Sequence, residues 1–281
     1  MPHVNGPFHR RLVPARPDLA AEHLRGRVKA ERFVAGRPAR VAPALLDLML
    51  DPDPAGERAT QLLHGEIFVV YEERADGLAW GQAQLDGYVG YVARDGLAPQ
   101  RGAGRPLTAL WSHRYEHPTV QGRATTALPF LADLPVSGST GGFARLRGGG
   151  HVPLPHFAPV AGDPAAQALR FAGAPYLWGG RSICGIDCSG LVQLAHLACG
   201  VALPRDSDMQ AALAGRPLAP EEPLARGDLV FWRGHVALML DGATLVHATA
   251  HRMAVVAEPL VAVEARVLDA GGGPILARRR P

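Results

Sequence analysis

The stretch Gly185–Gly190 constrains the fold of this chain most, because it places Cys188 where a turn becomes a helix. The helical pattern that follows stops at Gly200, a residue that commonly caps helix C-termini. An earlier helix begins at Asp163, with a proline behind it at the first helical position. Four strand patterns then fill residues 228–256. Helices followed by an antiparallel meander predict an α+β domain.

The residues ahead of this domain are typical of short β-strands joined by glycine-bearing turns. Strand patterns at Glu66–Glu72, Leu78–Ala83 and Leu85–Val92 indicate a small SH3-type barrel. Glycine-rich turns at 138–142 and 148–150 indicate a second one. We therefore predict one or two small β-barrels before the α+β domain. The predicted segments are an N-terminal extension at 1–38 with a helical pattern near Asp18–Leu24, a first barrel at 39–100, a second barrel at 101–160, and the α+β domain at 161–281.

Charge and hydropathy argue against two classes of partner. All but one of the 29 Lys and Arg residues are arginines, but they are scattered and form no basic stripe interleaved with aromatic residues, so nucleic acid is not expected. No apolar run approaches the roughly 20 residues that a membrane-spanning helix needs. The basic residues His9–Arg11 have no apolar segment of a secretory signal behind them. We therefore expect a cytoplasmic protein without a membrane span.

Cys188, His235 and His247 form a candidate nucleophile, base and orienting residue. A cysteine at the first turn of a helix faces backbone N–H groups and the positive end of the helix dipole, which favour the thiolate. A histidine base and a third group that orients its ring would complete the nucleophile. The two histidines can share one face of the sheet only if the loop between their strands has an odd number of residues. We predict a three-residue loop, Asp241–Ala243.

The other cysteines allow a second interpretation of the same segment. Cys184, Cys188, His196 and Cys199 are residue types that bind zinc. Three of them are spread over about three helical turns, which is too long for one tetrahedral centre, so no metal site is predicted. An odd number of cysteines also argues against a disulfide framework.

The α+β part of the chain resembles the NlpC-type branch of the papain-like cysteine peptidases, over roughly residues 163–257. Gly65–Glu66 and Asp86–Tyr91 are similar to the SH3-type barrel of the bacterial dipeptidyl-peptidase VI branch. The matching motifs in the α+β part are Pro175–Gly180, Asp187–Gly190, Leu203–Gln210, Gly227–Phe231, Gly234–Val236 and His247.

The resemblance implies a papain-like fold and a γ-D-glutamyl-L-diamino acid endopeptidase. Such an enzyme cleaves murein peptides with a free N-terminal L-Ala between D-Glu and the diamino acid, serves cell-wall recycling, and uses neither metal nor cofactor. By motif, Cys188 is the nucleophile, His235 the general base and acid, and His247 the orienting residue. The implied substrate contacts are Tyr88, Glu66 and Asp206 at the substrate ammonium, Tyr176 near the oxyanion, Trp178 along the cleft, and Asp187, Ser189, Arg205 and Ser207 on the dipeptide.

Two other functions fit parts of the same pattern. One is an amidase or acyltransferase of the same superfamily that acts on a different acyl group. The other is a wall-binding adaptor with an inert catalytic domain, which the intact set of cysteine and histidines disfavours. The sequence leaves the third substrate residue open between diaminopimelate and lysine, and it leaves the oligomeric state open.

Overall fold

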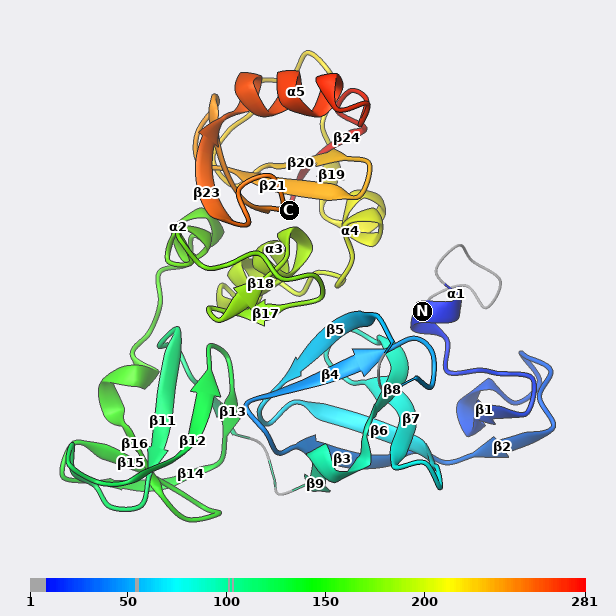
Figure 1. Ribbon diagram of the computed structural model, residues 1–281, viewed down its shortest axis with the longest axis vertical. Coiled ribbons are helices and arrows are strands. Elements are labelled where there is room, and N and C mark those ends of the chain that lie inside the picture. The colour runs from blue at the N-terminus through cyan, green and yellow to red at the C-terminus, as the bar shows by residue number, and fades with distance from the viewer. Residues whose placement is uncertain (1–8, 54–55, 101, 103) are drawn as a thin grey trace. The chain divides into compact units, whose positions relative to one another are not determined.

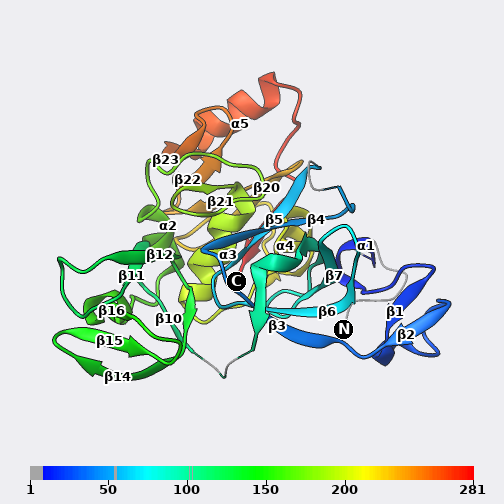
Figure 2. The ribbon, with the colours of Figure 1, turned by 60° about the horizontal axis from the view of Figure 1, so that its bottom comes forward.

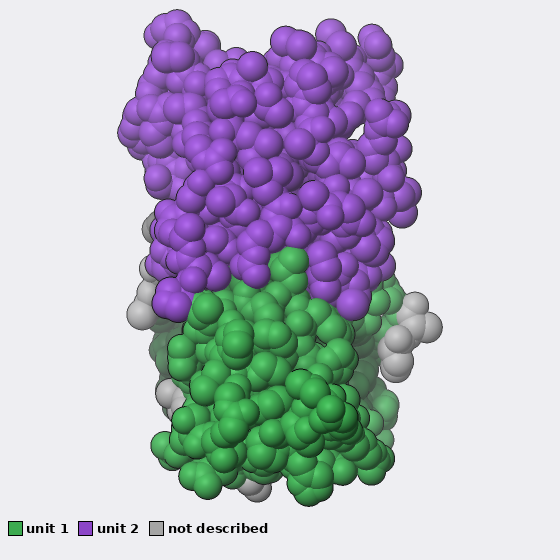
Figure 3. Space-filling model, turned by 90° about the vertical axis from the view of Figure 1, so that its left-hand side faces the viewer, with its two compact units in different colours: residues 1–158 green, residues 159–281 purple. Residues whose placement is uncertain are grey.

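The computed structural model describes residues 9–53, 56–100, 102 and 104–281, and the chain divides into two compact units, residues 1–158 and 159–281 (Figures 1 and 3). Each unit has its own sheets and its own buried apolar residues. None of the helices in the described part of the chain combines the length and the apolar character that crossing a bilayer requires.

A seven-stranded antiparallel sheet forms the centre of the first unit. Its strand order is β5-β4-β8-β7-β6-β3-β9. The predicted strands are confirmed at β6, β7 and β8. The strands are β3 (Arg37–Val41), β4 (Leu45–Met49), β5 (Arg58–Leu63), β6 (Ile67–Glu73), β7 (Leu78–Ala83), β8 (Val89–Ala93) and β9 (Leu97–Pro99), with the 3-10 turn η2 (Arg94–Gly96) before β9.

The N-terminal segment differs from the prediction of a helix near Asp18–Leu24. It contains α1 (His9–Leu12), then β1 (Leu19–Ala21), the single 3-10 turn η1 (Glu22–Leu24) and β2 (Arg32–Val34), which pairs parallel with β1. Leu19 packs into the apolar cluster of the large sheet together with Trp80. This tertiary contact outweighs the weak helical pattern of so short a segment.

A separate five-stranded antiparallel sheet, in the order β12-β11-β16-β15-β14, completes the first unit. It has its own core, which includes Leu107, Leu128 and Val152. Its strands are β11 (Trp111–Tyr115), β12 (Ala124–Pro129), β14 (Val136–Thr140), β15 (Phe143–Leu146) and β16 (His151–Pro153), and the 3-10 turn η3 (Leu154–Phe157) follows β16. The short strands β10 (Arg105–Pro106) and β13 (Asp133–Leu134) pair with each other in a separate two-stranded sheet.

The second unit is an α+β domain, as predicted, and its main sheet has six strands where four were predicted. The helices α3 and α5 lie on opposite sides of this sheet (Figures 1 and 2). The strand order is β19-β24-β20-β21-β22-β23. The elements are α2 (Pro164–Leu169), β17 (Arg181–Ser182), β18 (Gly185–Ile186), α3 (Cys188–Ala198), α4 (Ser207–Leu213), β19 (Arg216–Pro217), β20 (Leu229–Trp232), β21 (His235–Met239), β22 (Thr244–Thr249), β23 (Ala254–Pro259), α5 (Leu260–Asp269) and β24 (Ala277–Arg280).

Both faces of this sheet are covered. The helix α3 packs against β21 and β22. On the other face, Ala237 and Leu245 belong to an apolar cluster with Leu260 and Val263 of α5. The strand β24, which lies between β19 and β20 in this sheet, and the cover by α5 were not predicted, because residues 260–280 had no recognisable motif.

Candidate active site

Cys188 is the first residue of α3, and Asp187 caps the helix in front of it. One carboxylate oxygen of Asp187 accepts from the Gly190 N–H at 2.7 Å, and the other accepts from the Gly179 N–H at 2.9 Å. The cap therefore fixes the start of α3 and ties the preceding loop to it. The cysteine side chain is 6% exposed, and its sulfur accepts hydrogen bonds from the backbone N–H groups of Ser189 and Val236. Since Val236 follows His235, the sulfur lies at the start of β21.

The prediction of an odd loop between the two histidine strands is confirmed. Leu238 pairs with Val246, and the Leu240 N–H bonds to the carbonyl of Thr244, which leaves Asp241–Ala243 as a three-residue loop. Counting back along this register places His235 and His247 on one face of the sheet. Their rings meet there, with Nε2 of His235 at 2.8 Å from Nδ1 of His247.

Two further residues, which sequence reasoning missed, extend this pair. Nε2 of His247 lies 2.9 Å from Oε2 of Glu258, at the end of β23. Arg266 of α5 donates to both oxygens of that carboxylate, at 3.0 and 2.8 Å. Glu258 is opposite Leu245 in the register, on the face that holds the histidines. Sequence reasoning missed Glu258 because the register of β23 was not known, so nothing indicated that this carboxylate faces His247.

Burial controls the ionisation of the cysteine and the first histidine. Burial, and after it the neighbouring Asp187 carboxylate, raise the pKa of the Cys188 thiol to about 12, against the opposing effect of the two N–H donors. Burial, and then the His247 ring, lower the pKa of His235 to about 3. Burial therefore favours a neutral thiol and a neutral imidazole in the ligand-free site, against the predicted thiolate, because desolvation opposes the effect of the helix dipole.

Glu258 is a permanent anion beside this neutral pair. Hydrogen bonds from Arg266 lower its pKa to about 2, against desolvation, and the bond to His247 adds to the effect. Burial lowers the pKa of His247, while Glu258 opposes that shift. His247 is 1% exposed, so its ring is fixed by these two partners rather than by water.

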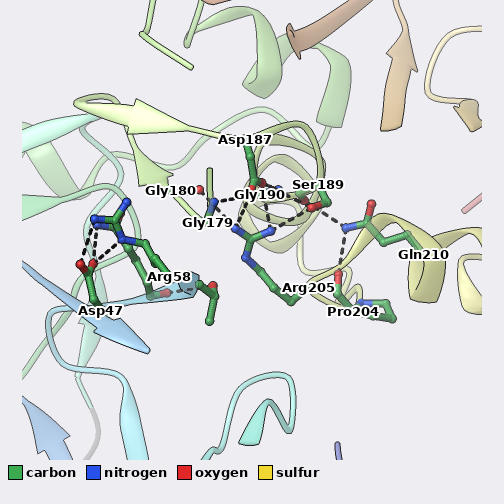
Figure 4. Close-up of polar contacts among 12 residues, drawn as sticks. Asp47, Arg58, Gly179, Gly180, Asp187, Ser189, Gly190, Pro204, Arg205 and Gln210 are labelled. Carbon is green, nitrogen blue, oxygen red and sulfur yellow. Dashed lines mark hydrogen bonds and ion pairs between the residues drawn. The ribbon is translucent and has the colours of Figure 1, made fainter. Parts of the chain in front are cut away.

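Arg205 lies inside the protein and binds the helix cap (Figure 4). Its guanidinium donates to both oxygens of Asp187, at 3.0 and 2.7 Å, and to the Ser189 hydroxyl at 2.9 Å. Gln210 of α4 donates to the carbonyls of Ser189 and Pro204, and so joins α4 to the same segment. Asp187, Ser189 and Arg205, three of the four residues predicted to contact the dipeptide, thus form a connected network, and Arg205 is 1% exposed within it.

The remaining predicted contacts of the second unit differ in exposure. Tyr176 is half-buried, and burial, followed by the Cys188 and Asp187 charges, raises the pKa of its hydroxyl to about 12. This hydroxyl stays protonated and can donate a hydrogen bond. Trp178 is 56% exposed. Asp206 is the N-cap residue of α4 without a side-chain cap hydrogen bond, and Ser207 begins that helix.

Tyr88 and Glu66 belong to the first unit. Tyr88 is 2% exposed and directly precedes β8, and its N–H donates to Asp86. The Glu66 carboxylate accepts from the Leu63 N–H at 3.0 Å, within its own turn. Their assignment to the substrate ammonium stays a prediction.

The other candidate zinc ligands have separate surroundings. Cys184 is exposed, and the Cys199 thiol lies 3.6 Å from the carbonyl of Ala161. Nδ1 of His196 bonds to the carbonyl of Val192 in its own helix.

Two protein families match this chain, one in each of its compact units. Residues 173–263 match the NlpC/P60 family, and residues 48–97 match the bacterial dipeptidyl-peptidase SH3 domain. Dipeptidyl-peptidase 6 of Lysinibacillus sphaericus is 42% identical over 82 residues, which cover 29% of this chain and 30% of the relative. Gamma-D-glutamyl-L-lysine dipeptidyl-peptidase of Bacillus subtilis is 32% identical over 144 residues, 45% of this chain and 48% of the relative. The chain thus spans less than half the length of these curated relatives.

A crystal structure of an NlpC/P60 family protein from Bacillus cereus has a similar fold. It superimposes with a TM-score of 0.73 over 86% of this chain and 99% of that one, at 18% identity. At this sequence identity the similarity is evidence for the fold alone. Together with the family matches, it shows that this chain carries an NlpC/P60 domain of papain-like fold, preceded by a bacterial dipeptidyl-peptidase SH3 domain.

Proposed function

We propose that this protein is a cysteine peptidase that hydrolyses the γ-D-glutamyl-diamino acid bond of murein peptides with a free N-terminal L-Ala. The observation that supports it best is the contact of 2.8 Å between His235 and His247, on neighbouring strands, because the residue after His235, Val236, donates its N–H to the Cys188 sulfur. A cysteine beside a histidine whose far nitrogen is held by a third group is an activated nucleophile. The two relatives support the substrate class, since both are named dipeptidyl-peptidases and the name of the Bacillus subtilis one specifies a gamma-D-glutamyl-L-lysine bond.

The attack requires a proton to move between two neutral groups. Nε2 of His235 is engaged by His247, so Nδ1 is the ring nitrogen that can take the thiol proton. The Cys188 sulfur then adds to the γ-carbonyl carbon of D-Glu. The imidazolium that forms donates its Nε2–H to His247, whose ring is held by the Glu258 anion, and this bond offsets part of the desolvation that lowers the pKa of His235. Transfer coupled to attack avoids a free thiolate in a buried site.

The tetrahedral intermediate needs donors at its oxyanion. The backbone N–H of Cys188 is the first of α3, so the helix itself does not use it, and the protonated Tyr176 hydroxyl is a second candidate. Collapse of the intermediate breaks the C–N bond. The leaving amine of the diamino acid takes its proton from His235, and a thioester of L-Ala-γ-D-Glu stays on Cys188. Water, deprotonated by His235, then hydrolyses the thioester.

The requirement for a free amino terminus follows from the cost of leaving the buried acceptors of the substrate ammonium without a partner. A substrate ammonium bound by carboxylate or hydroxyl acceptors cannot be replaced by an acetamide without leaving those acceptors unsatisfied. Glu66, Tyr88 and Asp206 are the proposed acceptors. An enzyme that needs this terminus would act on released wall peptides, which would place it in their recycling.

Product analysis by mass spectrometry tests the proposal. L-Ala-γ-D-Glu-diaminopimelate, its lysine analogue and the N-acetylated form of each are incubated with the wild type and with Cys188→Ala. We expect L-Ala-D-Glu from the free peptides, at least tenfold slower cleavage of the acetylated ones, and none by Cys188→Ala. Cys184→Ala, which changes another free cysteine, is the matched control and should retain activity.

The other outcomes separate the competing functions. Undiminished cleavage of the acetylated peptides would contradict the dipeptidyl assignment and favour an amidase or acyltransferase. Peptide binding by the wild type without any cleavage would favour the adaptor. Glu66→Gln, Tyr88→Phe and Asp206→Asn test the proposed acceptors one at a time, since each should raise KM for the free peptide only.

A further inference from the structure

The carboxylate of Glu258 contacts His247, and the guanidinium of Arg266 in α5 contacts that carboxylate. The contact between Glu258 and His247 is 2.9 Å, and the exposed fractions of the two side chains are 12% and 1%. Arg266 is fixed against Glu258 by two hydrogen bonds and is 24% exposed. The four groups thus form an unbroken row from His235 through His247 and Glu258 to Arg266.

The row determines which nitrogens carry hydrogen. An ionised carboxylate only accepts, so Nε2 of His247 must be protonated to bond with Glu258. In a neutral ring Nδ1 is then an acceptor, and the bond between the rings requires that Nε2 of His235 donates to it. The neutral His235 ring therefore has no hydrogen on Nδ1. That nitrogen holds the lone pair that can take a proton from Cys188.

We propose that Glu258, held by Arg266, is a positioning residue that fixes the tautomers of His247 and His235 and so keeps Nδ1 of His235 available as the base. This inference rests on the proposed function for its kinetic consequence, but the tautomers can be measured without substrate. A merely structural Glu258 would join β23 to α5 and would affect stability, with no effect on proton transfer.

The variant Glu258→Gln separates these roles. A glutamine whose amide donates to Nε2 of His247 reverses both tautomers and places a hydrogen on Nδ1 of His235. We expect kcat to fall by about 10²-fold, the lower end of what general acid–base catalysis contributes, with KM changed less than threefold. Glu258→Asp keeps the charge and should recover part of the loss. Glu264→Gln is the matched control, because it also removes one carboxylate charge. Glu264 lies in α5 two residues from Arg266, so the two side chains do not share a face of the helix.

The reactivity of the thiol gives a second readout that is independent of the substrate. Alkylation by iodoacetamide is followed at Cys188 by peptide mass spectrometry, with the exposed Cys184 of the same molecule as internal standard. At pH 7 the rate at Cys188 relative to Cys184 should fall at least tenfold in Glu258→Gln. His251 and Arg252 also face this row, so both rates are recorded from pH 5 to 9.

A double-variant cycle tests whether Glu258 acts through His247. In a His247→Ala background, Glu258→Gln should change kcat and the alkylation ratio less than twofold. Equal losses with and without His247, or a Glu258→Gln protein that matches the wild type in both readouts, would overturn the inference. If wild-type protein cleaves no murein peptide, the proposed function fails, whereas the alkylation ratio still decides the role of Glu258.

One measurement on the wild type covers the case in which Glu258→Gln does not fold. The ¹⁵N chemical shifts of the His235 ring, assigned by their loss in His235→Asn, show which nitrogen is protonated. A bare Nδ1 and a protonated Nε2 support the inference. The opposite pattern overturns it.

Discussion

Replacing Arg205 with methionine should destabilise the second unit, because it removes the partner of a buried carboxylate. Arg205 and Asp187 are 1% and 7% exposed, and two hydrogen bonds join them. Loss of one member of such a pair costs about 3–5 kcal/mol, mainly because the other charge stays buried. Asp187 retains the N–H groups of Gly179 and Gly190 as donors, so we expect the lower end, about 3 kcal/mol. Methionine fills most of the space, which limits any cavity term.

Calorimetry and urea unfolding measure this loss. For a unit of about 120 residues, 3 kcal/mol corresponds to a decrease in Tm of roughly 10–15 °C for the transition of residues 159–281. Arg25→Met is the matched control, since its ion pair with Glu22 is exposed on the first unit, and it should leave that transition unchanged. Cleavage should fall together with stability, because the pair holds the start of α3. A stable Arg205→Met protein with only a raised KM would refute this reasoning and would show that Arg205 acts chiefly on the substrate.

Two further predictions concern the helix start and the buried histidine. Gly190→Ala would bring a Cβ to 2.6 Å from the Gly180 carbonyl oxygen, so it should lower the unfolding free energy by more than about 1 kcal/mol. Gly162→Ala has open space around the new Cβ and should not lower it, and urea unfolding compares the two variants. Because the folded-state pKa of His235 is about 3, the unfolded chain binds a proton between pH 6.5 and 3 that the folded one does not. Stability should therefore fall as pH falls through this window, by up to about 1.4 kcal/mol per pH unit from this group. His235→Asn should show a shallower decline, and an equal slope in both proteins would contradict the assigned burial.

The sequence predicted the elements that local signals define. The apolar pattern that follows Cys188 and stops at Gly200 predicted α3, and the strand patterns with the turn residues around Asp241 predicted β21, β22 and their odd loop. Local sequence patterns did not predict the ionisation of Cys188, because it depends on how deeply the side chain is buried. The thiolate was predicted from the helix dipole and the backbone N–H groups at the helix start, whereas the burial of Cys188 raises the pKa of its thiol.

Contacts that depend on long-range register also escaped sequence reasoning. Glu258 reaches His247 only through the pairing of β22 with β23, and Arg266 reaches Glu258 only because α5 covers that face. Arg205 was predicted as a substrate contact from its motif, but its complete burial against Asp187 is visible only in three dimensions.

Capture of the covalent intermediate tests the central claim most directly. Wild-type protein is mixed with L-Ala-γ-D-Glu-diaminopimelate, quenched in acid within milliseconds and digested, and the cysteine peptides are weighed. The account predicts an L-Ala-D-Glu thioester on the peptide that contains Cys188 and none on the peptides of Cys184 or Cys199, with no adduct in Cys188→Ala. An adduct elsewhere, or hydrolysis that persists in Cys188→Ala, would contradict it.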